Sequence, residues 1–213
     1  MGLPRFRLSK VVFWCVLAIP LGLLANDIRI ELSSPTLGLG ADPEDAIVDH
    51  LGIWSIRYLW FTLFISSLAR LAKKPMLVQF RRMAGLWTFF MVLIHVTSYV
   101  LLFARVDFAT ILSDFTERPY IIAGLTGLCM LIPLAITSTR GWRRRLRQDW
   151  TRLHRLVYVA AIAGWIHLFW LERASFEESA IYGGILLLLF GERLFQFFRK
   201  RHNVNAANAQ SAS

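Results

Sequence analysis

The most restrictive feature of this sequence is a series of six long apolar runs separated by short polar stretches. They lie at about residues 8–25, 51–69, 83–104, 120–139, 153–171 and 179–198. A helix needs about 20 mostly apolar residues to cross a hydrocarbon core, so each run predicts one crossing. Of the 213 residues, 56% are hydrophobic, and six crossings leave no room for a sizeable soluble catalytic domain. The sequence therefore predicts an all-α membrane protein, a six-transmembrane-helix bundle.

The positions of the basic residues predict the orientation of this bundle. Segments 1–10, 70–82, 140–155 and 193–213 together hold 19 of the 24 lysines and arginines. Short loops that carry lysine and arginine stay on the cytoplasmic side of a membrane. We therefore expect both termini to be cytoplasmic.

The first apolar run could be either a cleavable signal or a membrane helix. The first run follows a basic stretch, as a cleavable secretory signal does, but Leu24-Ala25-Asn26 is a poor cleavage site and five further runs follow. We therefore favour an uncleaved first helix. Residues 1–7 are expected to form a cytoplasmic N-terminus, 8–200 the transmembrane domain, and 201–213 a small, polar and disordered cytoplasmic tail.

Neither the basic run nor the cysteines predict a further function. The arginine-rich segment 140–147 lies between two predicted crossings, which favours contact with anionic lipid headgroups over binding to nucleic acid. Cys15 and Cys129 lie inside apolar runs without a nearby partner, so neither a disulfide framework nor a zinc knuckle is expected.

Two histidines lie deep within predicted membrane spans. His95 follows Arg82 by 13 residues and His167 follows Arg155 by 12, which places both at roughly 18–20 Å of helix rise from the basic edge. The two spans run in the same direction, so the imidazoles can face each other at one depth. Ionisable side chains within a bilayer are costly and need a partner or a function.

Three interpretations of this pair are open. Facing imidazoles in an apolar setting suit a low-spin haem iron held from both sides. Zinc is the second interpretation, although it usually takes three or four protein ligands and no HExxH motif is present. The third is an interhelical hydrogen bond without any metal, as in a haem-free scaffold or transporter. We expect haem, with His95 and His167 as iron ligands.

Three further residues are candidates for the site. His154 lies about 20 Å from His167 along the same run and could be a ligand at an inner cofactor site or a proton acceptor for a quinol. Arg57 and Arg118 lie near the outer face, where each could pair with a haem propionate. Snorkelling of Arg57 to the interface and an ordinary helix-start charge at Arg118 are the alternatives. His50 and His202 are expected to be solvated.

Several short motifs together resemble a known family. They are Arg81-Arg82-Met83-Ala84-Gly85-Leu86, Glu117-Arg118-Pro119-Tyr120-Ile121, Leu134-Ala135-Ile136-Thr137-Ser138, Trp142-Arg143-Arg144-Arg145-Leu146, Leu153-His154-Arg155-Leu156-Val157-Tyr158 and His167-Leu168-Phe169-Trp170. With His95 and Trp150, they resemble the MsrQ (YedZ) family, the haem-binding membrane subunits of the bacterial periplasmic methionine sulfoxide reductase system. The resemblance covers about residues 8–200.

The resemblance implies a fold, cofactors and partners. It places the chain with ferric reductase-like and NADPH oxidase transmembrane domains, whose six helices carry haem b between the third and fifth. It implies electron transfer from the respiratory quinone pool, or from a cytoplasmic flavoprotein, to MsrP, a periplasmic molybdenum enzyme that reduces methionine sulfoxide in proteins. Flavin mononucleotide (FMN) is also implied. His95, His154 and His167 match the family's haem-associated histidines, but Arg81 and Arg82 stand where oxidase relatives have an inner histidine.

The sequence also suggests how electrons enter and leave. It has no nicotinamide and flavin domain after the last run, so we expect the donor to be a membrane quinol or a separate cytoplasmic flavin reductase. No reactive thiol is expected on the outer side, so methionine sulfoxide would be reduced elsewhere. A stand-alone metal-ion or quinone reductase that uses the same haem is the alternative function.

Overall fold

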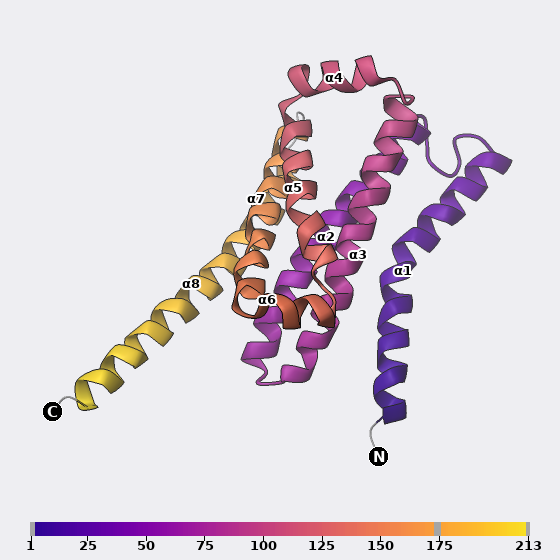
Figure 1. Cartoon of the computed structure of the whole chain (residues 1–213). Helices are drawn as coiled ribbons and strands as arrows, with labels where there is room; N and C mark the ends of the chain where they lie inside the picture. Colours follow the sequence, from indigo (N-terminus) through magenta and orange to yellow (C-terminus); the bar gives the residue numbers. More distant parts are fainter. Residues whose placement is uncertain (1–2, 173–175, 212–213) are drawn as a thin grey trace.

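The computed structural model describes residues 3–172 and 176–211, and over these residues it is helical without strands (Figure 1). Eight α-helices follow one another in this part of the chain: α1 Leu3–Ser33, α2 Pro43–Leu71, α3 Val78–Ser98, α4 Phe108–Glu117, α5 Pro119–Ile136, α6 Arg140–Leu153, α7 Leu156–Leu171 and α8 Glu177–Ser211. A short 3-10 turn, Pro75–Leu77, precedes α3, and a π-helical turn, Tyr99–Phe103, continues it.

The helices make this chain a multi-pass membrane protein. Five segments are long and apolar enough to cross a bilayer: Leu8–Ser33, Pro43–Leu71, Val78–Phe103, Pro119–Ile136 and Glu177–Asn203. A sixth crossing is obtained if α6 and α7, which are bent by 47° at the break between them, are counted as one span. The described part of the chain therefore holds five or six candidate crossings.

Four helices form the centre of the molecule. Figure 1 shows α2, α3, α5 and α7 side by side, with α1 and α8 on opposite sides of them. One apolar cluster joins α2, α5, α7 and α8 through residues such as Leu63, Leu131 and Ala161, and a second joins α1, α2 and α3 through Leu17, Leu51 and Met91. Because α2 contributes to both clusters, it holds the bundle together.

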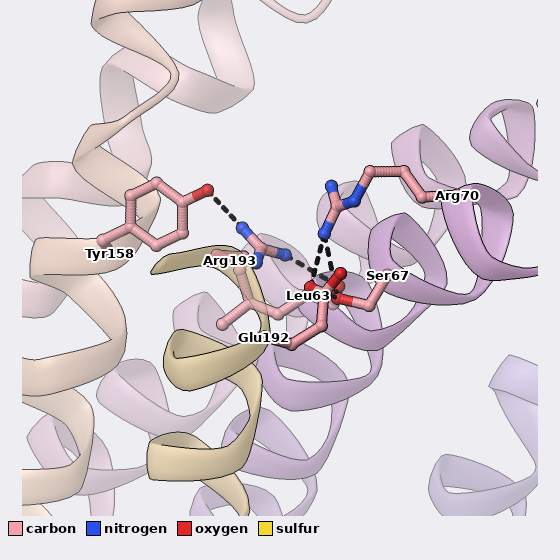
Figure 2. A network of polar contacts seen from close by, with 6 residues as sticks. All are labelled: Leu63, Ser67, Arg70, Tyr158, Glu192 and Arg193. Carbon is pink, nitrogen blue, oxygen red and sulfur yellow. Dashed lines mark hydrogen bonds and ion pairs between the residues drawn. The ribbon is translucent and has the colours of Figure 1, made fainter. Parts of the chain in front are cut away.

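A polar network ties α8 to α2 and α7, as Figure 2 shows. Its members are Leu63, Ser67, Arg70, Tyr158, Glu192 and Arg193. Arg193 donates to the carbonyl oxygen of Leu63 at 2.8 Å and to the hydroxyl of Tyr158. Glu192 accepts from Arg70 at 2.7 Å and from the hydroxyl of Ser67 at 2.8 Å. Neighbouring helices thereby supply partners for Glu192 Oε2 and for both terminal nitrogens of Arg193.

Two of the stretches between the predicted crossings contain helices of their own. Residues 104–119 contain α4, which begins because the Asp107 carboxylate accepts hydrogen bonds from the backbone N–H groups of Ala109 and Thr110. Residues 140–155 contain α6, which Thr139 caps. The α8 helix continues to Ser211, through most of the tail for which we predict disorder.

Candidate functional site

The structure brings together the two histidines predicted to meet within the membrane. His95 lies on α3 and His167 on α7, and their ring centroids are 6.2 Å apart with an angle of 81° between the ring planes. These residues belong to helices that are separated in the sequence by α4, α5 and α6. Their assignment as iron ligands stays a prediction.

Each imidazole is held by a backbone carbonyl of a neighbouring helix. His95 Nδ1 lies 3.1 Å from the carbonyl oxygen of Val48 on α2, and His167 Nδ1 lies 2.6 Å from that of Tyr120 on α5. A carbonyl oxygen can only accept, so Nδ1 carries the proton in both rings and donates it. The lone pair of Nε2 is then available for a metal, which is the usual arrangement of a ligating histidine.

The distance between the two rings fits an iron atom bound from both sides. A metal–nitrogen bond of about 2 Å on each side and roughly 1.1 Å from each nitrogen to its ring centre add up to about 6.2 Å. The observed separation of 6.2 Å agrees with this value. No group of three or more His, Cys, Asp or Glu side chains suited to a metal is found in residues 3–172 and 176–211. The donor set therefore suits haem, which needs two protein ligands, better than zinc.

His154 lies away from this pair, at the break between α6 and α7. Its ring stacks on Trp150 with the centroids 3.9 Å apart, and its Nε2 lies 3.2 Å from the hydroxyl oxygen of Thr137. The Thr137 hydroxyl donates its proton to the carbonyl oxygen of Pro133 at 2.6 Å, so it accepts from His154 Nε2. This assigns the proton of His154 to Nε2 and leaves Nδ1 as the acceptor.

A cavity of about 830 Å³ opens beside His154. Its wall combines apolar side chains of α2, α3, α5 and α7 with five arginines, Arg81, Arg82, Arg140, Arg143 and Arg144. None of the described residues that line it is acidic. The cavity wall is therefore partly positively charged and partly apolar, and His95 and His167 do not line it.

Arg57 and Arg118, the two predicted propionate partners, contact other groups. Arg57 donates to the hydroxyl of Tyr182 at 2.8 Å, and its guanidinium lies 5.0 Å from the ring centroid of Trp54. Arg118 forms an ion pair with Asp114 at 3.1 Å. A hydrogen bond to Tyr120 is the main cause that raises the pKa of Arg118, and the nearby Asp114 carboxylate adds to it. Asp114 already compensates much of the charge that a propionate would meet.

Sequence reasoning missed the groups that orient the histidines, and it also missed the partner of His50. Val48 and Tyr120 act through their main chains, which leave no mark in a residue pattern. Both hydrogen bonds span 47 residues, but this equal spacing becomes visible only once the structure shows which carbonyl each histidine contacts. His50 is not simply solvated as predicted, because its Nε2 lies 3.1 Å from the carbonyl oxygen of Pro20.

Comparison with known proteins agrees with these features. Residues 51–165 match the family described as ferric reductase like transmembrane component. The protein-methionine-sulfoxide reductase heme-binding subunit MsrQ of Xanthomonas campestris pv. campestris (strain B100) is 44% identical over 188 residues, which cover 88% of this chain and 86% of that protein. The protein of the same name from Herminiimonas arsenicoxydans is 37% identical over 206 residues, with 95% and 92% covered. The chain therefore belongs to the ferric reductase-like transmembrane proteins and, among them, to the MsrQ family.

Proposed function

We propose that this chain is the haem-binding, electron-transferring subunit of a protein-methionine-sulfoxide reductase system. In this proposal His95 and His167 are the axial ligands of one b-type haem. The observation that carries it is the pair itself, because two imidazoles 6.2 Å apart, each with Nδ1 on a carbonyl, leave both Nε2 atoms for one iron. A bound haem b would supply a one-electron carrier within the membrane.

The direction of electron flow follows from the topology that we propose. In it, α7 is the fifth of six crossings, both termini lie in the cytoplasm, and the membrane is the bacterial inner membrane. The clustering of 19 of 24 basic residues at one set of helix ends supports this orientation. His167 then lies five residues before Glu172, near the outer end of α7, so the acceptor is periplasmic. The MsrQ relatives are named as heme-binding subunits of a protein-methionine-sulfoxide reductase, and the acceptor that we propose is the MsrP-like molybdenum enzyme that the family resemblance implies.

The inner cavity is the part of the molecule best suited to the electron donor. The apolar side chains of its wall suit a membrane quinol. His154, which lines the cavity, can accept a proton at Nδ1. The five arginines of the cavity wall would also suit the phosphate of the FMN that the family resemblance implies. They would equally suit the phosphate of the cofactor of a cytoplasmic flavin reductase. An inner haem ligated by His154 is the remaining proposal for this histidine.

One experiment separates this function from a stand-alone metal-ion reductase. Proteoliposomes that contain the chain are reduced with a quinol, and the reduced haem band is followed after addition of either a ferric chelate or the periplasmic molybdenum enzyme with methionine sulfoxide. We expect rapid reoxidation only with the enzyme and its substrate. Equal reoxidation by the chelate alone would favour the metal-ion reductase, and a protein without haem would leave only the scaffold or transporter.

A further inference from the structure

The two histidines are held by the same local construction, used twice. On α2 the carbonyl of Val48 accepts from His95, and Gly52 follows Val48 by four residues. On α5 the carbonyl of Tyr120 accepts from His167, and Gly124 follows Tyr120 by four residues. Each member of the second set lies 72 residues after its counterpart (48 to 120, 52 to 124, 95 to 167). The residues that flank these positions differ between the two sets, so the sequence shows no obvious repeat.

The glycine four residues after the carbonyl has a specific effect in a helix. The carbonyl of residue i accepts from the N–H of residue i+4, and the side chain of residue i+4 leans back over the preceding turn. It would therefore lie where a second donor has to approach the same carbonyl. Without a Cβ atom, the carbonyl oxygen stays open from the side.

The distances support this effect at both positions. A Cβ atom on Gly52 would lie 3.1 Å from Cε1 and 3.4 Å from Nδ1 of His95. A Cβ atom on Gly124 would lie 2.8 Å from Nδ1 and 3.1 Å from Cε1 of His167. Each would press on the imidazole close to the atom that donates to the carbonyl, so the ring would have to move away.

We infer that Gly52 and Gly124 are positioning residues for the haem, because each keeps one backbone carbonyl open to the Nδ1–H of an axial histidine. The carbonyl fixes the tautomer and the direction of the ring, and Nε2 is thereby aimed at the iron. This inference rests on the proposed function and adds to it the residues that shape the ligand pair.

Two other glycines serve as matched controls. Gly127 lies on α5, three residues after Gly124, and a Cβ atom there would meet the carbonyl oxygen of Ala160 at 3.7 Å, an ordinary van der Waals contact. Gly184 lies on α8, and a Cβ atom there would meet nothing within 4 Å among the described residues. Alanine at these positions changes helix propensity in the same way without touching a histidine.

The test compares the full-length variants Gly52→Ala, Gly124→Ala, Gly127→Ala and Gly184→Ala in nanodiscs. Haem retention against a haem-scavenging protein and the midpoint potential are measured on each. We expect about 10-fold to 100-fold weaker retention in the first two variants, the range typical for loss of a hydrogen bond to a metal ligand. The haem that stays should have a more positive potential, because an imidazole without its Nδ1–H···O bond donates less electron density to ferric iron. The two controls should match the wild type.

A second measurement keeps the inference separable from the proposed function. NMR of isotope-labelled histidine in the haem-free chain reports which ring nitrogen carries the proton, and we expect Nδ1–H for His95 and His167, lost at the affected ring in Gly52→Ala and Gly124→Ala. A wild type that binds no haem would refute the proposed function. The tautomer signal would still test whether Gly52 and Gly124 position the two histidines. Wild-type retention, potential and tautomers in both glycine variants would overturn the inference. If Gly124→Ala fails to fold, Gly52→Ala decides, since its closest contact is with the far end of a movable ring.

Discussion

At the scale of single residues, main-chain carbonyls rather than charged side chains accept the hydrogen bonds of the deepest polar groups. His95 and His167 donate to the carbonyls of Val48 and Tyr120, and Tyr58 donates to that of Leu17. A carbonyl can satisfy a neutral N–H or O–H without adding a charge that lipid would penalise. On α8, the ionised side chains of Glu192 and Arg193 are instead held by the network in Figure 2.

Replacing Arg193 should loosen α8 from the bundle. Arg193→Met keeps the length of the side chain and removes the hydrogen bonds to Leu63 and Tyr158. Each such bond contributes on the order of 1 kcal/mol in a membrane protein, so we expect a lower midpoint of thermal unfolding in detergent. Arg199→Met, at an exposed position of the same helix, is the control and should change the midpoint little. Equal midpoints for the two variants would show that the network does not hold α8.

At the scale of elements, the short helix α4 links the end of α3 to the start of α5. The Asp114 carboxylate accepts from the hydroxyl of Tyr99 in the π-helical turn and pairs with Arg118 just before α5. Because Tyr120 follows Arg118 closely and its carbonyl holds His167, α4 is connected to the candidate haem site.

The N-cap of α4 should make this helix sensitive to acid. The hydroxyl and backbone N–H of Thr110 and the backbone N–H of Ala109 hydrogen-bond to Asp107 and lower the pKa of its carboxyl below the ordinary value. A lowered pKa stabilises the folded helix above the ordinary pKa of aspartate, about 3.9, and this contribution is lost as the pH falls through the lower, folded value.

We therefore expect the amide hydrogens of α4 in the wild type to exchange faster in acid than the loss of fold elsewhere would require. At neutral pH, we expect them to exchange faster in the variant Asp107→Ala than in the wild type. Glu117→Ala, at the other end of α4, is the control and should exchange as the wild type does. Peptide-resolved mass spectrometry measures both. Unchanged exchange in Asp107→Ala would show that packing alone determines the stability of this helix.

The sequence predicts the features that depend on the length of the apolar runs and on the depth of a residue within them. It does not predict the features that depend on a contact made by one residue. His95 and His167 were found because both lie at one distance from a basic edge. The α4 helix was missed because its ten residues are too few for a crossing and its start depends on one Asp107 carboxylate. Gly52 and Gly124 were missed because their effect requires knowing which helix packs on which histidine.

At the scale of the whole molecule, the proposed orientation in the membrane would direct electrons outward. We expect Pro35→Cys and Thr116→Cys to react with a membrane-impermeant maleimide added to intact cells, because both lie in predicted outer segments. Ala72→Cys and Thr151→Cys should react only after the membrane is opened. The native Cys15 and Cys129 are first replaced by serine in this experiment. The reverse labelling pattern would place both termini outside.

The central claim is that one haem is held between α3 and α7 by two histidines. Its most direct test is the haem-to-protein ratio and absorption spectrum of the purified wild type, His95→Ala, His167→Ala and the control His202→Ala. The claim predicts a low-spin spectrum in the wild type and the control, and loss of this species in both His95→Ala and His167→Ala. An unchanged low-spin spectrum in those two variants, or a folded wild type that binds no haem, would contradict it.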